Sequence, residues 1–294
     1  MFSKKNYLKI IAEKPDIFQK IPDFILEPKK IEEYRQIPNL AVGEISGLNN
    51  FEALKHTLSL KRFDAFLPTI SYSGTEYGDW GGEGSLFLKK IKKTIEKELK
   101  VYCADPVVLG SPQFWWALNG RFAHELYERF GFNTHCYGCR LYAFALRVPL
   151  CKMIDAHLFI PSGHENDGMG CSMDCASVVA RYCSILMASF GIDVQHDFSA
   201  GSRERKINDD GHDERGKIIR CVLAGNCHRI DGSLYEPKNL NVYYESFALP
   251  VAGRIMSRIL SGTVFDYVQE VSAILTPGQK INKQKKTSIK TLKN

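Results

Sequence analysis

The chain has 294 residues, of which 44% are hydrophobic and 24% are charged, as is ordinary for a globular protein with a sizeable core. Its formal net charge of +6 favours polyanionic partners only mildly. No apolar run reaches the roughly 18 residues that a membrane-spanning helix needs, and the N-terminus has no signal-peptide core, so we expect a cytoplasmic protein without a membrane segment. Its nine cysteines should then be reduced thiols.

Residues 1–39 show helical periodicity in short pieces broken by prolines, which we interpret as an N-terminal helical extension. Residues 40–275 alternate between strand and helix patterns, which predicts one α/β domain with a doubly wound, mainly parallel sheet. Strands are expected at 40–45, 64–73, 101–109, 156–163 and 191–198, with a short apolar element at 220–226. Helices are expected at 51–58, 84–100, 111–131, 135–155, 172–190 and 238–260. The lysine-rich residues 276–294 are interpreted as a disordered tail or, alternatively, as an RNA-binding arm.

The stretch 40–58 reads as a buried strand, a Ser46-Gly47 turn and a helix that Asn49 or Asn50 can cap. At such a junction the backbone N–H groups and the positive end of the helix dipole point at one spot, which suits an anion such as phosphate. Most junctions of this kind bind nothing, so the local pattern alone favours a simple helix cap.

This stretch resembles the pyrophosphate-binding loop of the PP-loop ATP pyrophosphatase superfamily, in which a strand ends in Ser-Gly-Gly-x-Asp-Ser or a shorter Ser-Gly-Arg-Asp-Ser. The segments GTEYGDW, LGSPQFWWALNGRF, RFGFNTHCYGCRLYAFALRVPL and CVLAGN are similar to uncharacterised archaeal and bacterial PP-loop-like proteins, and the resemblance covers roughly residues 41–260. It implies a PP-loop (HUP-like) fold and ATP with Mg²⁺ as cofactors, with Ser46, Gly47, Asn49, Asn50 and Arg121 as nucleotide contacts.

The loop also departs from that family. Leu48, Asn49 and Asn50 stand where the shorter variant has Arg-Asp-Ser, so the acidic residue and the second hydroxyl are missing. We therefore expect ATP binding more than ATP cleavage.

Cysteines supply the second informative pattern. Cys136-x-x-Cys139 opens a predicted helix, where two thiolates on one turn could bind one metal and the helix N-terminus favours the thiolate form. An inert pair of thiols is the alternative. Several PP-loop enzymes that thiolate tRNA hold a [4Fe-4S] cluster by a CxxC pair and one later cysteine. The resemblance implies that Cys136, Cys139 and Cys221 are these three catalytic and metal-binding residues, with one iron left open for an exchangeable sulfide.

The fourth ligand and the metal stay open at this point. The candidate fourth ligands are His135, Cys171, Cys175 and Cys227, and Zn²⁺ is the alternative to the cluster. Polar residues follow two of the predicted strands, at the edge where an α/β sheet binds ligands. After the strand at 64–73 these are Glu76, Asp79 and Trp80. After the strand at 156–163 they are His164, Glu165 and Asp167, which suit Mg²⁺ or acid–base contacts.

Three functions are consistent with these patterns. The first is an ATP-dependent sulfurtransferase that adenylates either a base in tRNA or another RNA, or a small substrate. The second is a nucleotide- or cluster-binding partner protein that has lost catalysis. The third is an RNA-binding module that uses the basic tail.

Overall fold

The computed structural model describes residues 14, 18–23, 26–45, 48–60, 63–78, 83–161, 177–195, 220–223, 226–227, 229 and 234–276, with the backbone alone for 48–53, 83–87 and 220. The expected basic tail, the Ser46-Gly47 turn and the polar turn at 164–168 lie outside these residues.

A sheet of seven parallel strands forms the centre of the molecule, in the order β1-β6-β3-β2-β7-β8, with β5 also paired to β3. This confirms the predicted doubly wound parallel α/β fold. The strands are β1 (Phe18–Lys20), β2 (Leu40–Glu44), β3 (Ala65–Tyr72), β5 (Tyr102–Cys103), β6 (Val107–Gly110), β7 (Leu158–Ile160) and β8 (Asp193–Val194). A separate antiparallel pair joins β4 (Glu76–Tyr77) to β9 (Arg220–Cys221).

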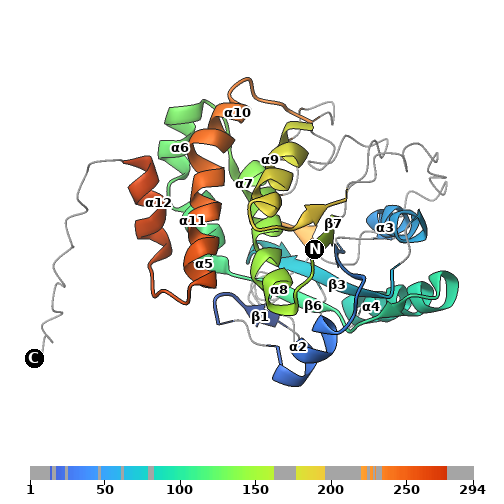
Figure 1. Cartoon of the computed structure of the whole chain (residues 1–294). Helices are drawn as coiled ribbons and strands as arrows, with labels where there is room; N and C mark the ends of the chain where they lie inside the picture. The colour runs from blue at the N-terminus through green and yellow to red at the C-terminus, as the bar shows by residue number, and fades with distance from the viewer. Residues whose placement is uncertain are drawn as a thin grey trace, which may run out of the picture.

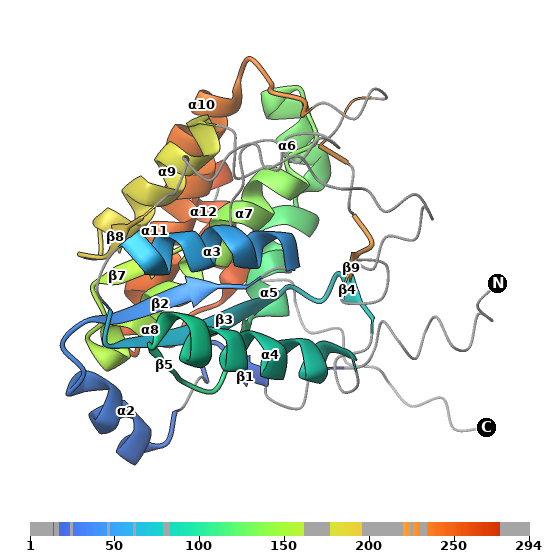
Figure 2. The same cartoon turned by 90° about the vertical axis from the view of Figure 1, so that its right-hand side faces the viewer.

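Helices cover both faces of the sheet (Figures 1 and 2). On one face lie α3 (Leu48–Leu60) and α4 (Glu83–Thr94), which continues as a π-helical turn, η1 (Ile95–Leu99). The helices beyond the other face include α7 (His135–Ala145), α8 (Arg147–Ile154), α9 (Ser177–Ala188), α11 (Leu249–Leu260) and α12 (Tyr267–Leu275). The shorter helical segments are α2 (Pro28–Arg35), α5 (Pro112–Trp115), η2 (Trp116–Gly120), α6 (Ala123–Phe130), α10 (Leu240–Tyr243) and η5 (Tyr244–Ala248).

Strand β2 shows why the sheet is buried on both sides. All five of its residues are buried. Val42 packs into the large cluster beneath α7 to α12, whereas Ala41 packs into the smaller cluster beneath α3 and α4. Successive side chains on a strand point to opposite faces, so both faces must be apolar in a doubly covered sheet. Among the described helices, none is long and apolar enough to span a membrane.

Several boundaries differ from the sequence expectations. Residues 101–109 form two strands, β5 and β6, because the intervening Pro106 has no N–H to donate to a ladder. The helix expected at 111–131 is interrupted at Phe122, whose backbone leaves helical geometry before α6. The helix expected at 135–155 divides at Leu146 into α7 and α8.

Besides the two-residue strand β4, two described elements were not predicted. Phe18–Lys20, within the segment interpreted as a helical extension, forms β1 and pairs with β6 at the edge of the main sheet. Helix α12 follows Asp266, whose carboxylate accepts a hydrogen bond of 2.9 Å from the N–H of Gln269. That N-cap is a signal that the sequence did contain.

Candidate functional site

Strand β2 ends where the winding of the sheet changes direction. The chain leaves β2 through α3 and returns as β3 on one side, while β7 pairs on the other side. Open α/β sheets bind ligands in the crevice beyond the carboxyl ends of strands at this switch point. Helix α3 begins at Leu48, so Asn49 and Asn50 lie inside its first turn and do not precede it as caps. Backbone N–H groups of a first helical turn have no partner within the helix and are suited to an anion.

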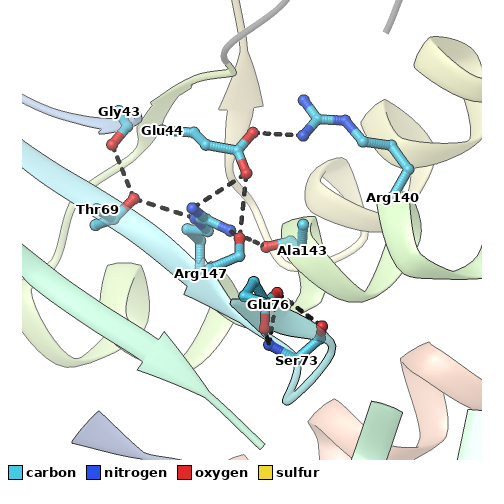
Figure 3. A network of polar contacts seen from close by, with 9 residues as sticks. Gly43, Glu44, Thr69, Ser73, Glu76, Arg140, Ala143 and Arg147 are labelled. Carbon is cyan, nitrogen blue, oxygen red and sulfur yellow. Dashed lines mark hydrogen bonds and ion pairs between the residues drawn. The ribbon is translucent and has the colours of Figure 1, made fainter. Parts of the chain in front are cut away.

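Glu44, the last residue of β2, is held by two arginines (Figure 3). Its side chain is 4% exposed, and Arg140 from α7 donates a hydrogen bond to its Oε2. Nη2 of Arg147 lies 3.3 Å from Oε1 as an ion pair without hydrogen-bond geometry, and the Ser71 hydroxyl donates to Oε1 over 3.1 Å. The carboxylate is therefore fixed between α7, α8 and β3.

Arg147 crosses from α8 to the sheet and is fully buried. Its Nε donates to Oγ1 of Thr69 over 3.1 Å, and its Nη1 donates to the Ser71 hydroxyl and to the Ala143 carbonyl. Burial lowers the pKa of Arg147, and the neighbouring Glu44 opposes that change. Because arginine stays protonated in proteins, two guanidinium groups face one carboxylate here. The surplus positive charge near the α3 N-terminus favours an anionic ligand.

The predicted cysteines lie in the same region. Cys136 and Cys139 occupy the first turns of α7, and Cys221 in β9 is paired with Glu76 of β4. Sγ of Cys221 lies 3.2 Å from the Thr75 hydroxyl. The segment after β9 links the two thiol elements, because the Leu223 N–H donates to Cys221 over 3.3 Å and the Cys136 thiol donates to the Leu223 carbonyl over 3.8 Å. Leu223 thus contacts both Cys136 and Cys221, two of the three cysteines that the sequence singled out.

Burial and neighbouring groups raise the pKa of the Cys136 and Cys139 thiols, which favours their protonated form. A hydrogen bond with Cys227 is the largest cause that raises the pKa of Cys136, followed by burial and by the nearby charges of Cys139 and Cys221. Burial raises the pKa of Cys139 to about 12, and the Glu76 carboxylate adds to the effect. A protonated thiol is a poor nucleophile. As metal-free thiols, Cys136 and Cys139 are therefore poorly suited to direct attack on a substrate.

Glu76, expected near the ligand edge, closes the turn that follows β3. Its carboxylate accepts hydrogen bonds from the backbone N–H groups of Ser73 and Gly74, the latter over 2.9 Å, and from the Ser73 hydroxyl over 2.7 Å. Burial raises the pKa of Glu76, and these hydrogen bonds act in the opposite direction. The turn holds β4 in place beside Cys221.

Several buried polar atoms near α7 have no hydrogen-bond partner among the described residues: the indole Nε1 of Trp115, both amide atoms of Asn119 and the hydroxyl of Tyr243. Asn119 and Tyr243 are fully buried and lie against Gly138, the residue before Cys139. Burial is the largest cause that raises the pKa of Cys139 and of Tyr243, while Trp115 acts to lower the first and Thr134 the second. Buried polar atoms without a good hydrogen bond are rare, so this place behind Cys139 is unusual within the described part of the fold.

The other expected contacts have different outcomes. Arg121 is exposed, with its guanidinium 5.9 Å from the centre of the Trp116 ring. His135 has its pKa lowered by burial and contacts Asn133. Expected positions outside the described residues are Ser46, Gly47, Asp79, Trp80, His164, Glu165, Asp167, Cys171 and Cys175.

Sequence reasoning missed Arg140, Arg147 and Glu44. Two signals were available: a charged residue that ends an apolar strand, and two arginines seven positions apart, which share one side of a helical segment.

Thiols are the donors that zinc and iron–sulfur clusters prefer. Within the described part of the chain, however, no three His, Cys, Asp or Glu side chains are arranged to hold a metal ion. The donor chemistry therefore fits such a centre, but the thiols would have to move closer together to coordinate it.

Fold and site together define a doubly wound parallel α/β protein with a cationic network and a group of cysteines beyond the carboxyl edge of its sheet. No family model matches the chain. The chain is similar to an uncharacterized protein of Methanocaldococcus jannaschii, with 22% identity over 249 residues that cover 82% of this chain and 87% of that protein.

Proposed function

We propose that this protein is a cytoplasmic, ATP-dependent activating enzyme that adenylates a carbonyl oxygen, on an RNA base or a small substrate, to prepare it for sulfur transfer. ATP with Mg²⁺ would lie beyond β2, with its phosphates on the Ser46-Gly47 turn and the N-terminus of α3. This proposal joins the PP-loop resemblance of the sequence to the charge surplus at the switch point.

One observation carries the proposal. Cys139 and Arg140 are neighbours on α7, yet Arg140 contacts Glu44 at the end of β2 while Cys139 lies within electrostatic reach of Cys221 and Glu76. The anion-favouring end of the site and its thiol end are therefore positioned by the same helix. A two-step reaction, in which an activated substrate is attacked by sulfur, needs both ends close together.

The proposed reaction has two steps. The substrate oxygen attacks the α-phosphorus of ATP, and the bond to pyrophosphate breaks; a sulfur nucleophile then attacks the activated carbon, and AMP leaves with the oxygen. The field of Arg140 and Arg147, with Arg121 or nearby lysines as further contacts, would offset the phosphate charge. A zinc ion or cluster bound by Cys136, Cys139 and Cys221 would keep their thiols deprotonated. The side chains around the switch point would orient the phosphates and exclude water.

A second candidate is a nucleotide-binding partner protein without catalysis. Leu48, Asn49 and Asn50, which replace the acidic and hydroxyl residues of the resembled loop, form the first turn of α3. This turn supplies backbone N–H groups for binding but lacks the acidic residue and the second hydroxyl of that loop.

Pyrophosphate release distinguishes the two candidates. The full chain, purified anaerobically, is incubated with ATP, Mg²⁺, sulfide and bulk tRNA, and pyrophosphate and thiolated nucleosides are measured. The enzyme proposal expects both products, lost in Cys139→Ala and retained in the control Cys151→Ala, whose thiol lies in the core. Nucleotide binding without pyrophosphate would reject the enzyme in favour of the partner protein.

A further inference from the structure

Trp115 and Trp116 are neighbours in the chain but have opposite surroundings. Trp115 is buried in the large core cluster, and its ring centre lies 6.3 Å from that of His135 in the first turn of α7. Trp116, by contrast, has 49% of its surface exposed. Adjacent residues of a helix point in different directions, which explains why one indole is buried while the other is open to solvent.

The indole of Trp116 lies along its own helical turn. A Cβ at Gly120 would be 3.0 Å from Cδ1 of Trp116, so the lack of a side chain at Gly120 leaves room for the ring. The exposed Arg121 guanidinium lies 5.9 Å from the centre of this ring, and it makes no ion pair or side-chain hydrogen bond with the described residues. A cation near an indole ring is a favourable pair. Trp116 therefore presents an open aromatic surface with a positive charge beside it.

Strand β6 determines where this pair lies. The strand ends at Gly110, and α5 and η2 follow directly. Because β6 runs parallel to β3, its end belongs to the carboxyl edge of the sheet, where open α/β sheets bind ligands. Trp116 and Arg121 are thus carried by the segment that leaves the same edge as Glu44.

This segment packs against two elements that carry cysteines. Asn119 of η2 lies against Gly138 in the first turn of α7. At the start of the segment, Pro112 of α5 lies against Gly74, in the turn that leads from β3 to β4. That turn also borders Cys221 of β9. The open indole is therefore held next to both α7 and the β4–β9 pair.

The surroundings of Trp116 suit one flat group and not a broad apolar partner. Between residues 111 and 121 the other exposed side chains are Gln113 and Arg121, which are polar. Protein partners usually bind contiguous apolar patches, whereas an unpaired base needs only one aromatic face. Every nucleobase has a π-face, and a guanidinium can bind the phosphate that accompanies it. An unpaired base of an RNA strand fits this combination.

The order of the strands separates this surface from the proposed ATP site. ATP is proposed to lie beyond β2, whereas Trp116 follows β6, and β3 lies between these two strands. A reaction between ATP and an acceptor base needs two neighbouring sites, one for each reactant. The β6 side of the edge thus leaves a place for the acceptor base.

We propose that Trp116 and Arg121 form a stacking platform for an unpaired base of the RNA substrate: the indole stacks on the base, and the guanidinium binds a neighbouring phosphate. The inference rests on the proposed function and narrows it, because it names single-stranded RNA over a small molecule as the substrate. It also assigns Arg121 to the RNA and not to ATP.

Fluorescence anisotropy with a labelled single-stranded RNA of about 12 nucleotides tests the platform. The full chain and its variants Trp116→Ala, Trp116→Phe and Arg121→Gln are titrated at several salt concentrations, and the same RNA annealed to its complement serves as the duplex probe. Tyr102→Ala is the control, because Tyr102 is 47% exposed in β5, which pairs with Ala65 at the opposite, amino end of β3. Calorimetry with ATP and Mg²⁺ is carried out on the same proteins.

We expect Trp116→Ala to weaken binding of the single-stranded RNA about 5- to 150-fold, the usual effect of removing one aromatic stacking partner. Trp116→Phe should retain most of the affinity because it keeps an aromatic face. Arg121→Gln should reduce the slope of log K against log salt by about 0.7, the change expected for one lost phosphate contact. The duplex should bind more weakly than the single strand, and Tyr102→Ala should bind as the wild type does.

Wild-type RNA affinity in Trp116→Ala would overturn the inference, as would equal binding of single strand and duplex; RNA binding by the basic tail alone would give both results. A loss of ATP affinity in Trp116→Ala without a loss of RNA affinity would assign the indole to adenine and overturn it too. The proposed function fails separately. If RNA binding depends on Trp116 but no adenine nucleotide binds, the platform stands and the activating enzyme is rejected.

Discussion

Helix α7 contributes to two regions of opposite character. Around Glu44, the buried carboxylate and the buried Arg147 contact each other and also β3 and α7 through side-chain and backbone partners. Around Cys139, the buried donors of Trp115, Asn119 and Tyr243 have no partners among the described residues. The first region is paired within the protein apart from Nη2 of Arg147, which meets Glu44 as an ion pair only, whereas the second leaves several buried polar atoms without a hydrogen-bond partner among the described residues.

This difference distinguishes a region that supports the fold from a region that is suited to binding a ligand. A satisfied charge network fixes geometry, because moving any member leaves a buried charge unpaired. Unsatisfied donors around protonated thiols gain partners when a ligand or metal arrives. We therefore interpret the charge network of Glu44, Arg140 and Arg147 as the rigid frame of the switch point. The cysteines Cys136, Cys139 and Cys221 are interpreted as the part that takes up a ligand.

The largest expected effect on the free energy of unfolding comes from removing Arg147 from the charge network around Glu44. Arg147→Met should destabilise the fold by about 3 to 5 kcal/mol, since the buried Glu44 loses a counter-charge and Thr69 and Ser71 lose a donor. Chemical denaturation of the variant and wild type measures the change.

Arg181→Met is the control, because its guanidinium is exposed and lies 5.1 Å from the centre of the Tyr182 ring. It should cost about 1 kcal/mol or less. Equal losses in the two variants would contradict the assignment of Arg147 as part of the frame.

Two tyrosines test partnered against unpartnered hydroxyls. The Tyr142 hydroxyl donates to the Tyr72 carbonyl over 2.6 Å and accepts from the Ser111 N–H over 2.8 Å. Tyr142→Phe should cost about 2 to 3 kcal/mol because both backbone groups lose their partner. Tyr243→Phe, which removes a hydroxyl that meets the geometry of no hydrogen bond and has only Thr134 as a weak neighbour, should change the metal-free chain by less than about 1 kcal/mol.

Thermal unfolding of both variants, with and without metal, provides the measurement. Tyr243→Phe should lower stability only in the metal-bound chain. A large loss in the metal-free chain would show that this hydroxyl is already satisfied.

A pair of helical glycines tests the packing behind the thiols. A Cβ at Gly138 would overlap the Asn119 amide oxygen and the Tyr243 hydroxyl, so Gly138→Ala should cost about 1 to 3 kcal/mol. A Cβ at Gly253 in α11 would meet nothing within 4 Å, so Gly253→Ala should stabilise by about 0.5 to 1 kcal/mol. Denaturation midpoints measure both, and a neutral Gly138→Ala would contradict the tight packing there.

The smallest effect is expected at an exposed ion pair. Nζ of Lys92 lies 2.7 Å from Oδ1 of Asp105, and this hydrogen bond is the largest cause that lowers the pKa of Asp105. A lowered folded-state pKa stabilises the fold above the usual pKa of aspartate and loses that contribution as the pH falls through the lowered value. Asp105→Asn should cost less than about 1 kcal/mol at pH 7 and nothing at pH 2. Denaturation at both pH values checks this; an equal cost at both would exclude a charge effect.

The sequence predicted those parts of the fold that depend on local periodicity. Strand β2 and its helix follow from an apolar run and a period of about 3.6 residues, and the alternation of elements led to the parallel sheet. Helix α12 was missed although Asp266 supplies a cap signal. The three-residue strand β1 has too short a pattern to separate from its surroundings.

The candidate site was predicted in part. Cys136, Cys139 and Cys221 were singled out by a short motif and a family resemblance, and Cys136 and Cys221 both contact Leu223. The partnership of Arg140 with Glu44 spans 96 residues and depends on how α7 packs against the sheet, which no local pattern encodes. Cys227 was one of several fourth-ligand candidates, and its thiol lies close enough to Cys136 to raise the pKa of Cys136.

Calorimetric titration of the anaerobically purified full chain with ATP and Mg²⁺ tests the central claim most directly. The account predicts saturable binding of one nucleotide per chain, weakened in Arg140→Met, which removes positive charge beside β2, and unchanged in Arg181→Met. The absence of binding by ATP or any other adenine nucleotide, with the protein folded and Mg²⁺ present, would contradict the account.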